Sequence, residues 1–189
     1  MKKIIILFSG RASNLENILN TMHNKTVQIT ATITNNPQAQ GITISQAHSI
    51  PCTVIDEKKH PTKIAYNQAL LQTMQAHPCD LVVLAGYMRI LPSFLIEAYN
   101  HTPIINLHPS LLPRHKGLNA GQKSYEDEHA FGGVSVHFVN EKLDDGENIM
   151  QLEINKSQTS TLEEYERVLK EKEFEVLPKS ILRVLQIKQ

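Results

Sequence analysis

The sequence predicts an α/β fold, in which a doubly wound, mostly parallel sheet carries a mixed or antiparallel C-terminal extension. Two observations lead to this prediction. Short apolar runs alternate with polar turns and helical patterns through roughly the first hundred residues, which is typical of a doubly wound sheet. Beyond residue 130, two apolar runs follow each other across a turn-rich segment with no helical pattern between them. We expect both parts to share one sheet.

In the first half of the chain, the apolar runs predict five strands. Residues 4–8 form an unbroken apolar run, as expected of a strand buried on both faces. Apolar residues then recur at helical spacing from Leu15 to Met22. Further strands are expected over 29–33, 52–55, 81–85 and 103–106, and further helices over about 40–48, 62–76 and 92–99, the last with Pro92 in its first turn.

In the second half of the chain, the sequence pattern predicts a pair of strands and a C-terminal helix. The strands are expected over 134–139 and 149–154, joined by the turn-rich segment 140–148. A charged helix follows from about Leu162, and Glu173 falls inside its apolar stripe. A carboxylate there needs a partner, a ligand or a place near solvent.

Composition narrows the class of protein. The 189 residues fit one domain, 1–189, and 19 basic residues balance 19 acidic ones. A neutral chain argues against nucleic acid or an anionic membrane as the main partner. The longest apolar run has five residues, too few to cross a bilayer or to form a signal peptide, and Cys52 and Cys79 suit free buried thiols. We therefore expect a soluble cytoplasmic protein.

Polar segments follow four of the predicted parallel strands. They are residues 9–14, 35–36, 86–91 and 106–110. In open α/β sheets ligands bind beyond the carboxyl ends of the strands, so this edge is the predicted site. The first segment, Ser9–Asn14, suits a phosphate site at a helix start, with Ser13 and Asn14 as donors, or equally an ordinary capped helix.

Asn106 and His108 point to chemistry at the same edge. Side chains alternate along a strand, so the two should face the same way. An amide N–H suits an oxyanion, and an imidazole moves protons near neutral pH. Most of the nine histidines suit ordinary structural positions, and His137 suits a structural or supporting one. The segment Asp144–Gly146 favours a plain turn, and neither a calcium loop nor another metal site is indicated.

Four segments resemble the folate-dependent formyltransferases. They are Asn106–Pro113 followed by Gly117, Leu84–Leu91, Leu143–Gly146, and Ser9–Leu15. They occur in register along essentially the whole chain. The last segment makes the chain most similar to the purine-pathway branch, the glycinamide ribonucleotide transformylase family.

This resemblance implies transfer of a formyl group from 10-formyltetrahydrofolate to the amine of glycinamide ribonucleotide in purine biosynthesis. It implies that Asn106 stabilises the oxyanion, that His108 transfers protons and that Asp144 tunes His108. No metal is implied, and a monomer or a homodimer is equally compatible. The implied halves are 1–100, which binds the ribonucleotide phosphate, and 101–189, which holds the catalytic groups and folate.

The resemblance also implies the binding residues. The ribonucleotide would contact Ala12, Ser13, Asn14 and Glu173, and the folate would contact Lys63, Met88, Arg89, Ile90, Leu91 and Asn106. Three positions depart from the family pattern. Ala12 stands where glycine is common, and Asn119 and Phe174 each replace a histidine.

Other functions fit less well. A methionyl-tRNA formyltransferase would need a tRNA-binding domain, and a formyltetrahydrofolate hydrolase would need an N-terminal regulatory domain. A sugar-amine formyltransferase is disfavoured by the Ser9–Asn14 corner. A non-catalytic binding domain would not need Asn106, His108 and Asp144 together. A dinucleotide-dependent oxidoreductase would need a glycine fingerprint that is absent here.

Overall fold

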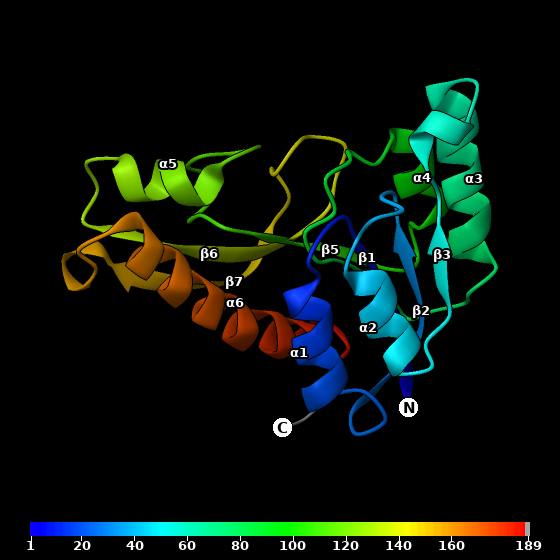
Figure 1. Ribbon diagram of the computed structural model, residues 1–189, viewed down its shortest axis with the longest axis horizontal. Coiled ribbons are helices and arrows are strands. Elements are labelled where there is room, and N and C mark those ends of the chain that lie inside the picture. The colour runs from blue at the N-terminus through cyan, green and yellow to red at the C-terminus, as the bar shows by residue number, and fades with distance from the viewer. Residues whose placement is uncertain (188–189) are drawn as a thin grey trace. The chain divides into compact units, whose positions relative to one another are not determined.

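The chain forms two compact units in the computed structural model, which describes residues 1–187 (Figure 1). The first unit is Met1–Ile105 and the second is Asn106–Gln189. The last two residues of the expected domain, 188 and 189, lie outside the described residues. Within residues 1–187, no helix combines the length and the apolar character needed to cross a membrane.

The predicted fold class is confirmed. The strands form a seven-stranded sheet in the order β3-β2-β1-β4-β5-β6-β7. In the first unit the strands are β1 (Lys2–Phe8), β2 (Val27–Thr34), β3 (Cys52–Val54) and β4 (Leu81–Leu84). β1 pairs in parallel with both β2 and β4, and β2 pairs in parallel with β3. Residues 4–8 are fully buried, as expected for a central strand covered on both faces.

Helices in the first unit follow the strands as predicted. They are α1 (Ser13–Thr21), α2 (Gly41–Ala47), α3 (Lys63–Gln75) and α4 (Ser93–Ala98), with a short 3₁₀ turn at Glu57–Lys59. α1 and α2 lie side by side (Figure 1). A Cβ at Gly41 would lie 2.3 Å from the Phe8 ring and 2.6 Å from the Ala12 Cβ, so only glycine fits there. Pro92 caps α4 from outside the helix instead of standing in its first turn.

The second unit is built on an antiparallel strand pair. The strand β5 (Ile104–His108) begins in the first unit and ends in the second. β6 (Phe131–Phe138) and β7 (Asn148–Asn155) pair antiparallel, which confirms the predicted strand pair. α5 (Ala120–Glu126), which the sequence did not predict, and α6 (Leu162–Val184) both contact β6 (Figure 1). A second 3₁₀ turn, Lys156–Gln158, leads from β7 towards α6.

The apolar stripe of α6 is buried as expected. Tyr165, Leu169 and Val176 are at most 5% exposed, and Glu173 among them is 6% exposed. The Lys170 amine donates to the Glu173 carboxylate. The buried carboxylate therefore has the partner that its position requires.

Candidate active site

The end of β5 carries two polar side chains of the second unit, of which Asn106 is half-buried and His108 is buried. Asn106 and His108 stand two residues apart on this strand, and His108 is only 4% exposed. The residue that meets them, Asp144, lies in the connection between β6 and β7, with φ 47°. A Cβ at Gly146 would lie 1.7 Å from the Phe138 carbonyl oxygen. Only glycine allows the chain to turn so closely, and this turn carries the Asp144 carboxylate inward.

Asp144 joins the expected catalytic residues. Its Oδ2 accepts a hydrogen bond of 2.8 Å from the Gly117 N–H and lies 3.4 Å from His108 Nδ1. Its Oδ1 accepts a hydrogen bond of 3.3 Å from Asn106 Nδ2. The Asp144 side chain is 8% exposed. The segment is thus a turn, as its composition suggested, but a turn that carries a buried carboxylate.

The Asp144 carboxyl is held in its ionised form. Burial acts to raise its pKa, but the contact with His137, the Gly117 N–H and the charge of His108 together outweigh burial. The pKa of Asp144 therefore lies below its ordinary value. At neutral pH the group presents a full negative charge to the neighbouring ring.

Opposing effects act on the pKa of His108. Burial lowers its pKa, while the Asp144 charge and the His115 carbonyl raise it, and the net result is a pKa below the ordinary value. His108 Nε2 lies 2.9 Å from the His115 carbonyl oxygen. Because a carbonyl can only accept, Nε2 carries the hydrogen. Nδ1, which faces Asp144, is then the nitrogen that gains and loses a proton.

His137 is a further member of this cluster. Its Nδ1 donates to the Phe138 carbonyl oxygen over 2.8 Å, and its Nε2 lies 3.1 Å from Asn106 Nδ2 and 3.5 Å from Asp144 Oδ1. In the neutral ring, Nε2 accepts from the Asn106 amide, which turns that NH₂ group inward. The sequence analysis assigned His137 a structural or supporting position, but it did not predict the contact with Asn106 and Asp144.

The loop after His108 is attached to the β6–β7 pair. Ser135 Oγ on β6 donates to the Ser110 carbonyl over 2.6 Å and accepts from the Leu112 N–H over 3.0 Å. Gln151 Nε2 on β7 donates to the Leu112 carbonyl over 3.0 Å. These bonds satisfy buried backbone groups and fix the path of the loop beside His108.

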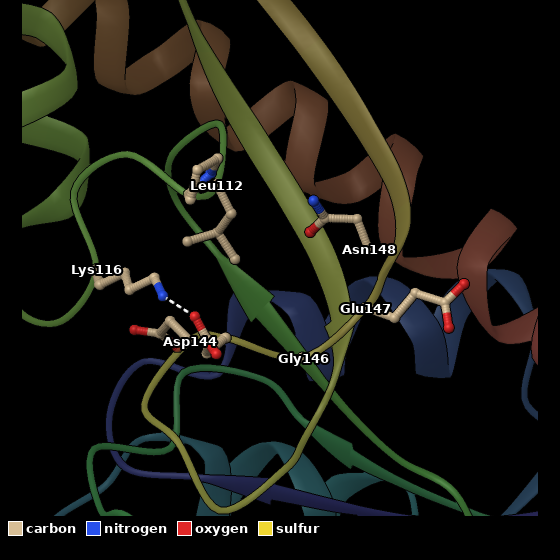
Figure 2. Close-up of a pocket in the computed structure, with 8 residues that line it drawn as sticks. Leu112, Lys116, Asp144, Gly146, Glu147 and Asn148 are labelled. Atoms are coloured by element: carbon tan, nitrogen blue, oxygen red, sulfur yellow. Dashed lines mark hydrogen bonds and ion pairs between the residues drawn. The ribbon is translucent and has the colours of Figure 1, made fainter.

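A cavity of about 260 Å³ is lined in part by Asp144 and by Leu112 of this loop (Figure 2). The Lys116 amine donates to the Asp145 carboxylate at its edge, whereas Glu147 points away from the other labelled side chains (Figure 2). No group of three or more His, Cys, Asp or Glu side chains within residues 1–187 is arranged to hold a metal ion. The lining residues are Leu112, Pro113, Lys116, Asp144, Asp145, Gly146, Glu147 and Asn148.

Sequence comparison assigns the chain to a family. The model of the formyl transferase family matches residues 2–181. The chain belongs to this family. It is 34% identical to the phosphoribosylglycinamide formyltransferase of Haemophilus influenzae, over 94% of this chain and 84% of that protein. It is 33% identical to the phosphoribosylglycinamide formyltransferase of Bacillus subtilis, over 98% of this chain and 95% of that protein.

Solved structures of formyl transferases have the same fold. The phosphoribosylglycinamide formyltransferase from Campylobacter jejuni superposes with a TM-score of 0.91 at 38% identity, covering 97% of both chains. The corresponding enzyme from Bacillus halodurans also gives a TM-score of 0.91, at 32% identity over 97% of this chain and 95% of that chain.

In the first unit of this formyl transferase, three strand ends meet as the sequence predicted. Ser9, after β1, accepts from the Met88 N–H over 2.7 Å through Oγ and donates to Asn35 Oδ1. Asn36 Nδ2 donates to the Ser9 carbonyl over 3.0 Å. The Ser9 N–H donates to the Gly86 carbonyl over 3.0 Å. Ser9 therefore ties the ends of β1, β2 and β4 together.

The Ser9–Asn14 corner is the start of a helix without a side-chain cap. Ala12 precedes α1 with φ 58°, in the left-handed region, and its side chain makes no capping hydrogen bond. Ser13 is half-buried and Asn14 is 6% exposed. The start of a helix carries the positive end of the helix dipole and directs backbone N–H groups outward, which is an arrangement that attracts an anion.

The residues that the resemblance assigned to folate include four side chains at the surface of the first unit. Met88 is 56% exposed and Ile90 is 62% exposed, while Leu91 is buried. Arg89 Nη2 pairs with Glu57 Oε2 at 2.8 Å. Lys63 is exposed at the first position of α3.

Proposed function

We propose that this chain transfers the formyl group of 10-formyltetrahydrofolate to the primary amine of glycinamide ribonucleotide. Family membership and the names of the relatives support this assignment. The observation that carries it is the buried contact of Asn106, His108 and Asp144 in the second unit. A neutral amide donor, a proton carrier and an ionised carboxylate are the groups that acyl transfer to an amine requires.

The proposed reaction begins with attack of the substrate amine on the formyl carbon. A carbon–nitrogen bond forms, and the formyl oxygen becomes a tetrahedral oxyanion. The attacking amine then loses a proton, the folate nitrogen takes one up, and its bond to the formyl carbon breaks. His108 carries this proton on Nδ1, beside the Asp144 carboxylate at 3.4 Å, which stabilises the protonated ring.

Asn106 is the proposed donor to the oxyanion. Its NH₂ group has two hydrogens, and two acceptors lie near it, His137 Nε2 at 3.1 Å and Asp144 Oδ1 at 3.3 Å. We infer that the oxyanion takes the hydrogen now shared with Asp144, because that contact is the longer one. Loss of such a donor costs about 100- to 1000-fold in turnover.

Further substrate contacts are proposed for residues outside the catalytic group, and those of the first unit come first. In the first unit, Ala12, Ser13 and Asn14 are proposed to bind the ribonucleotide phosphate through the start of α1. The exposed apolar side chains of Met88 and Ile90 suit a flat ring such as a pterin.

The remaining proposed contacts are with Leu91, Arg89 and Lys63, for the folate, and with Glu173, for the amine end of the ribonucleotide. The buried Glu173 carboxylate suits a cationic or N–H-bearing group. We also propose that the reaction uses no metal ion, because an amide donor and a histidine supply the charge stabilisation and the proton transfer. The proposed location is the cytoplasm, as a monomer or homodimer.

The test is a spectrophotometric assay of the purified protein with a 10-formyl folate and glycinamide ribonucleotide. A folate signal that changes only when both substrates are present supports the proposal, and His108→Ala serves as the inactive control. A change with the folate alone would indicate a hydrolase. Folate binding without any change would contradict the proposed acceptor and direct the search to another amine.

A further inference from the structure

A second charged cluster lies in the second unit, centred on Asp127 at the end of α5. Three basic side chains meet its carboxylate. Arg114 Nη1 lies 2.9 Å from Oδ2, His115 Nε2 lies 2.5 Å from Oδ2, and Lys156 Nζ lies 2.7 Å from Oδ1. The backbone N–H of His129 also donates to Oδ1, over 3.0 Å. None of these groups belongs to the proposed catalytic set.

Lys156 fixes this cluster to the protein frame. Its Nζ donates to the carbonyl oxygens of Ser124, Tyr125 and Asp127 over 3.0, 3.1 and 2.6 Å, as well as to the Asp127 carboxylate. The Lys156 side chain is 12% exposed and the Asp127 side chain 14% exposed. Solvent therefore screens these contacts weakly, and the Asp127 carboxylate has little freedom to move.

His115 connects this cluster to the proposed active site. Its side chain contacts Asp127, and its backbone carbonyl accepts the Nε2–H of His108 at 2.9 Å. His115 has φ 55°, a left-handed conformation that is unfavourable for a residue with a Cβ. His115 therefore combines this backbone conformation with a ring contact to Asp127 and a carbonyl that faces His108.

We propose that Asp127 is a positioning residue that holds the His115 carbonyl against His108 Nε2. This contact selects the His108 tautomer with hydrogen on Nε2 and leaves Nδ1, which faces Asp144, as the nitrogen that exchanges the proton. The inference rests on the proposed proton-transfer role of His108. In this proposal Asp127 touches neither the substrates nor His108, and it acts on His108 through the backbone carbonyl of His115.

The direct test is the tautomer of His108, measured by NMR of the protein labelled with ¹⁵N-histidine. The ring nitrogens of His108 are assigned by their loss in His108→Gln. In the wild-type protein, above the pKa of His108, we expect the Nε2–H form. In Asp127→Asn we expect a mixture of both tautomers, because the neutral amide no longer holds the His115 ring.

A second variant allows the same test if Asp127→Asn does not fold. His115→Gly removes the side-chain link while glycine adopts a positive φ freely, and it leaves the Asp127–Lys156 contact intact. We expect the same mixture of tautomers. The matched control is Asp80→Asn, because Asp80 also accepts from a lysine, Lys2 at 3.0 Å, and from a backbone N–H, Lys3 at 2.7 Å, but lies in the first unit. We expect the wild-type tautomer there.

Kinetics give the second readout. The tautomer with hydrogen on Nδ1 cannot accept a proton at Nδ1. Because both variants would populate this tautomer, we expect kcat to fall by about 10- to 100-fold in Asp127→Asn and His115→Gly, while KM for either substrate stays within about 2-fold. An unchanged tautomer in either folded variant would overturn the proposal. The NMR readout needs no substrate, so a failure of the proposed formyl transfer would be seen in the wild-type assay alone and kept apart from a failure of this inference.

Discussion

Replacement of Asp144 by asparagine tests the centre of the proposed site. The substitution removes a negative charge and preserves the size of the side chain. Unit charges 3.4 Å apart attract each other by about 5 kcal/mol at an effective dielectric constant near 20. Asparagine withdraws that attraction from the protonated His108 ring. A 100-fold loss in turnover corresponds to about 2.7 kcal/mol, which lies within this limit. We therefore expect kcat to fall by at least about 100-fold.

The same variant changes the pH dependence in a defined direction. Asp144 is one of the groups that raise the pKa of His108 against the effect of burial. Without this charge, the pKa of His108 falls further below its ordinary value. The limb of the kcat profile that depends on protonated His108 therefore moves to lower pH. The measurement is kcat for wild type and Asp144→Asn across about pH 5 to 9.

Asp80→Asn is the control for this experiment, since it removes a carboxylate of the first unit that is paired with lysine. We expect its kcat and its pH profile to match those of wild type. If Asp144→Asn kept wild-type turnover with an unshifted profile, the proposed coupling between Asp144 and His108 would be wrong.

Three further predictions concern single residues. His108→Ala lowers kcat by at least about 100-fold with an unchanged circular dichroism spectrum, and near-normal turnover would exclude the proton-transfer role. Gly146→Ala forces a Cβ to within 1.7 Å of the Phe138 carbonyl oxygen, so urea unfolding should show a loss of at least about 2 kcal/mol, and unchanged stability would contradict the close turn. Asp127→Asn lowers stability at neutral pH by about 2 to 3 kcal/mol, as for a partly buried ion pair. Burial acts to raise the pKa of Asp127, but the hydrogen bonds from Lys156, His115 and the His129 N–H keep it well below its ordinary range. The advantage of wild type should therefore be constant above about pH 4 and vanish as the pH falls through the folded-state pKa, and an advantage that persisted in strong acid would contradict this linkage.

The parts of the fold that depend on local pattern were predictable. The continuous apolar runs of β1 and β4 and the paired runs of β6 and β7 carry their own signal. The helix α5 does not, because only Ala120 and Ser124 of its seven residues are buried. Its last carbonyls are satisfied by Lys156, which lies about thirty positions further along the chain. Because its contacts with Lys156 and α6 are distant in the sequence, α5 has no local periodicity to detect.

In the candidate site too, some residues were indicated by the sequence pattern and others were not. The spacing of Asn106 and His108 on one strand indicated a shared face, and the structure brings both to Asp144. Asp144 itself was assigned only through resemblance, because a turn composition alone hides a buried carboxylate. The contribution of His115 was missed for a different reason. It acts on His108 through its backbone carbonyl, and no side-chain pattern reports that.

Three residues near the proposed substrate and catalytic groups have left-handed backbone without being glycine. They are Ala12, His115 and Asp144, with φ of 58°, 55° and 47°. Such a conformation is unfavourable for a residue with a Cβ, so each persists only where its surroundings hold it. Ala12 packs its Cβ over Gly41, His115 is tied to Asp127, and Asp144 is tied to the Gly117 N–H. In each case the compensating contact comes from another part of the same unit. The local geometry that directs the α1 N–H groups, the His115 carbonyl and the Asp144 carboxylate is therefore a tertiary property, invisible to any rule that looks for glycine in turns.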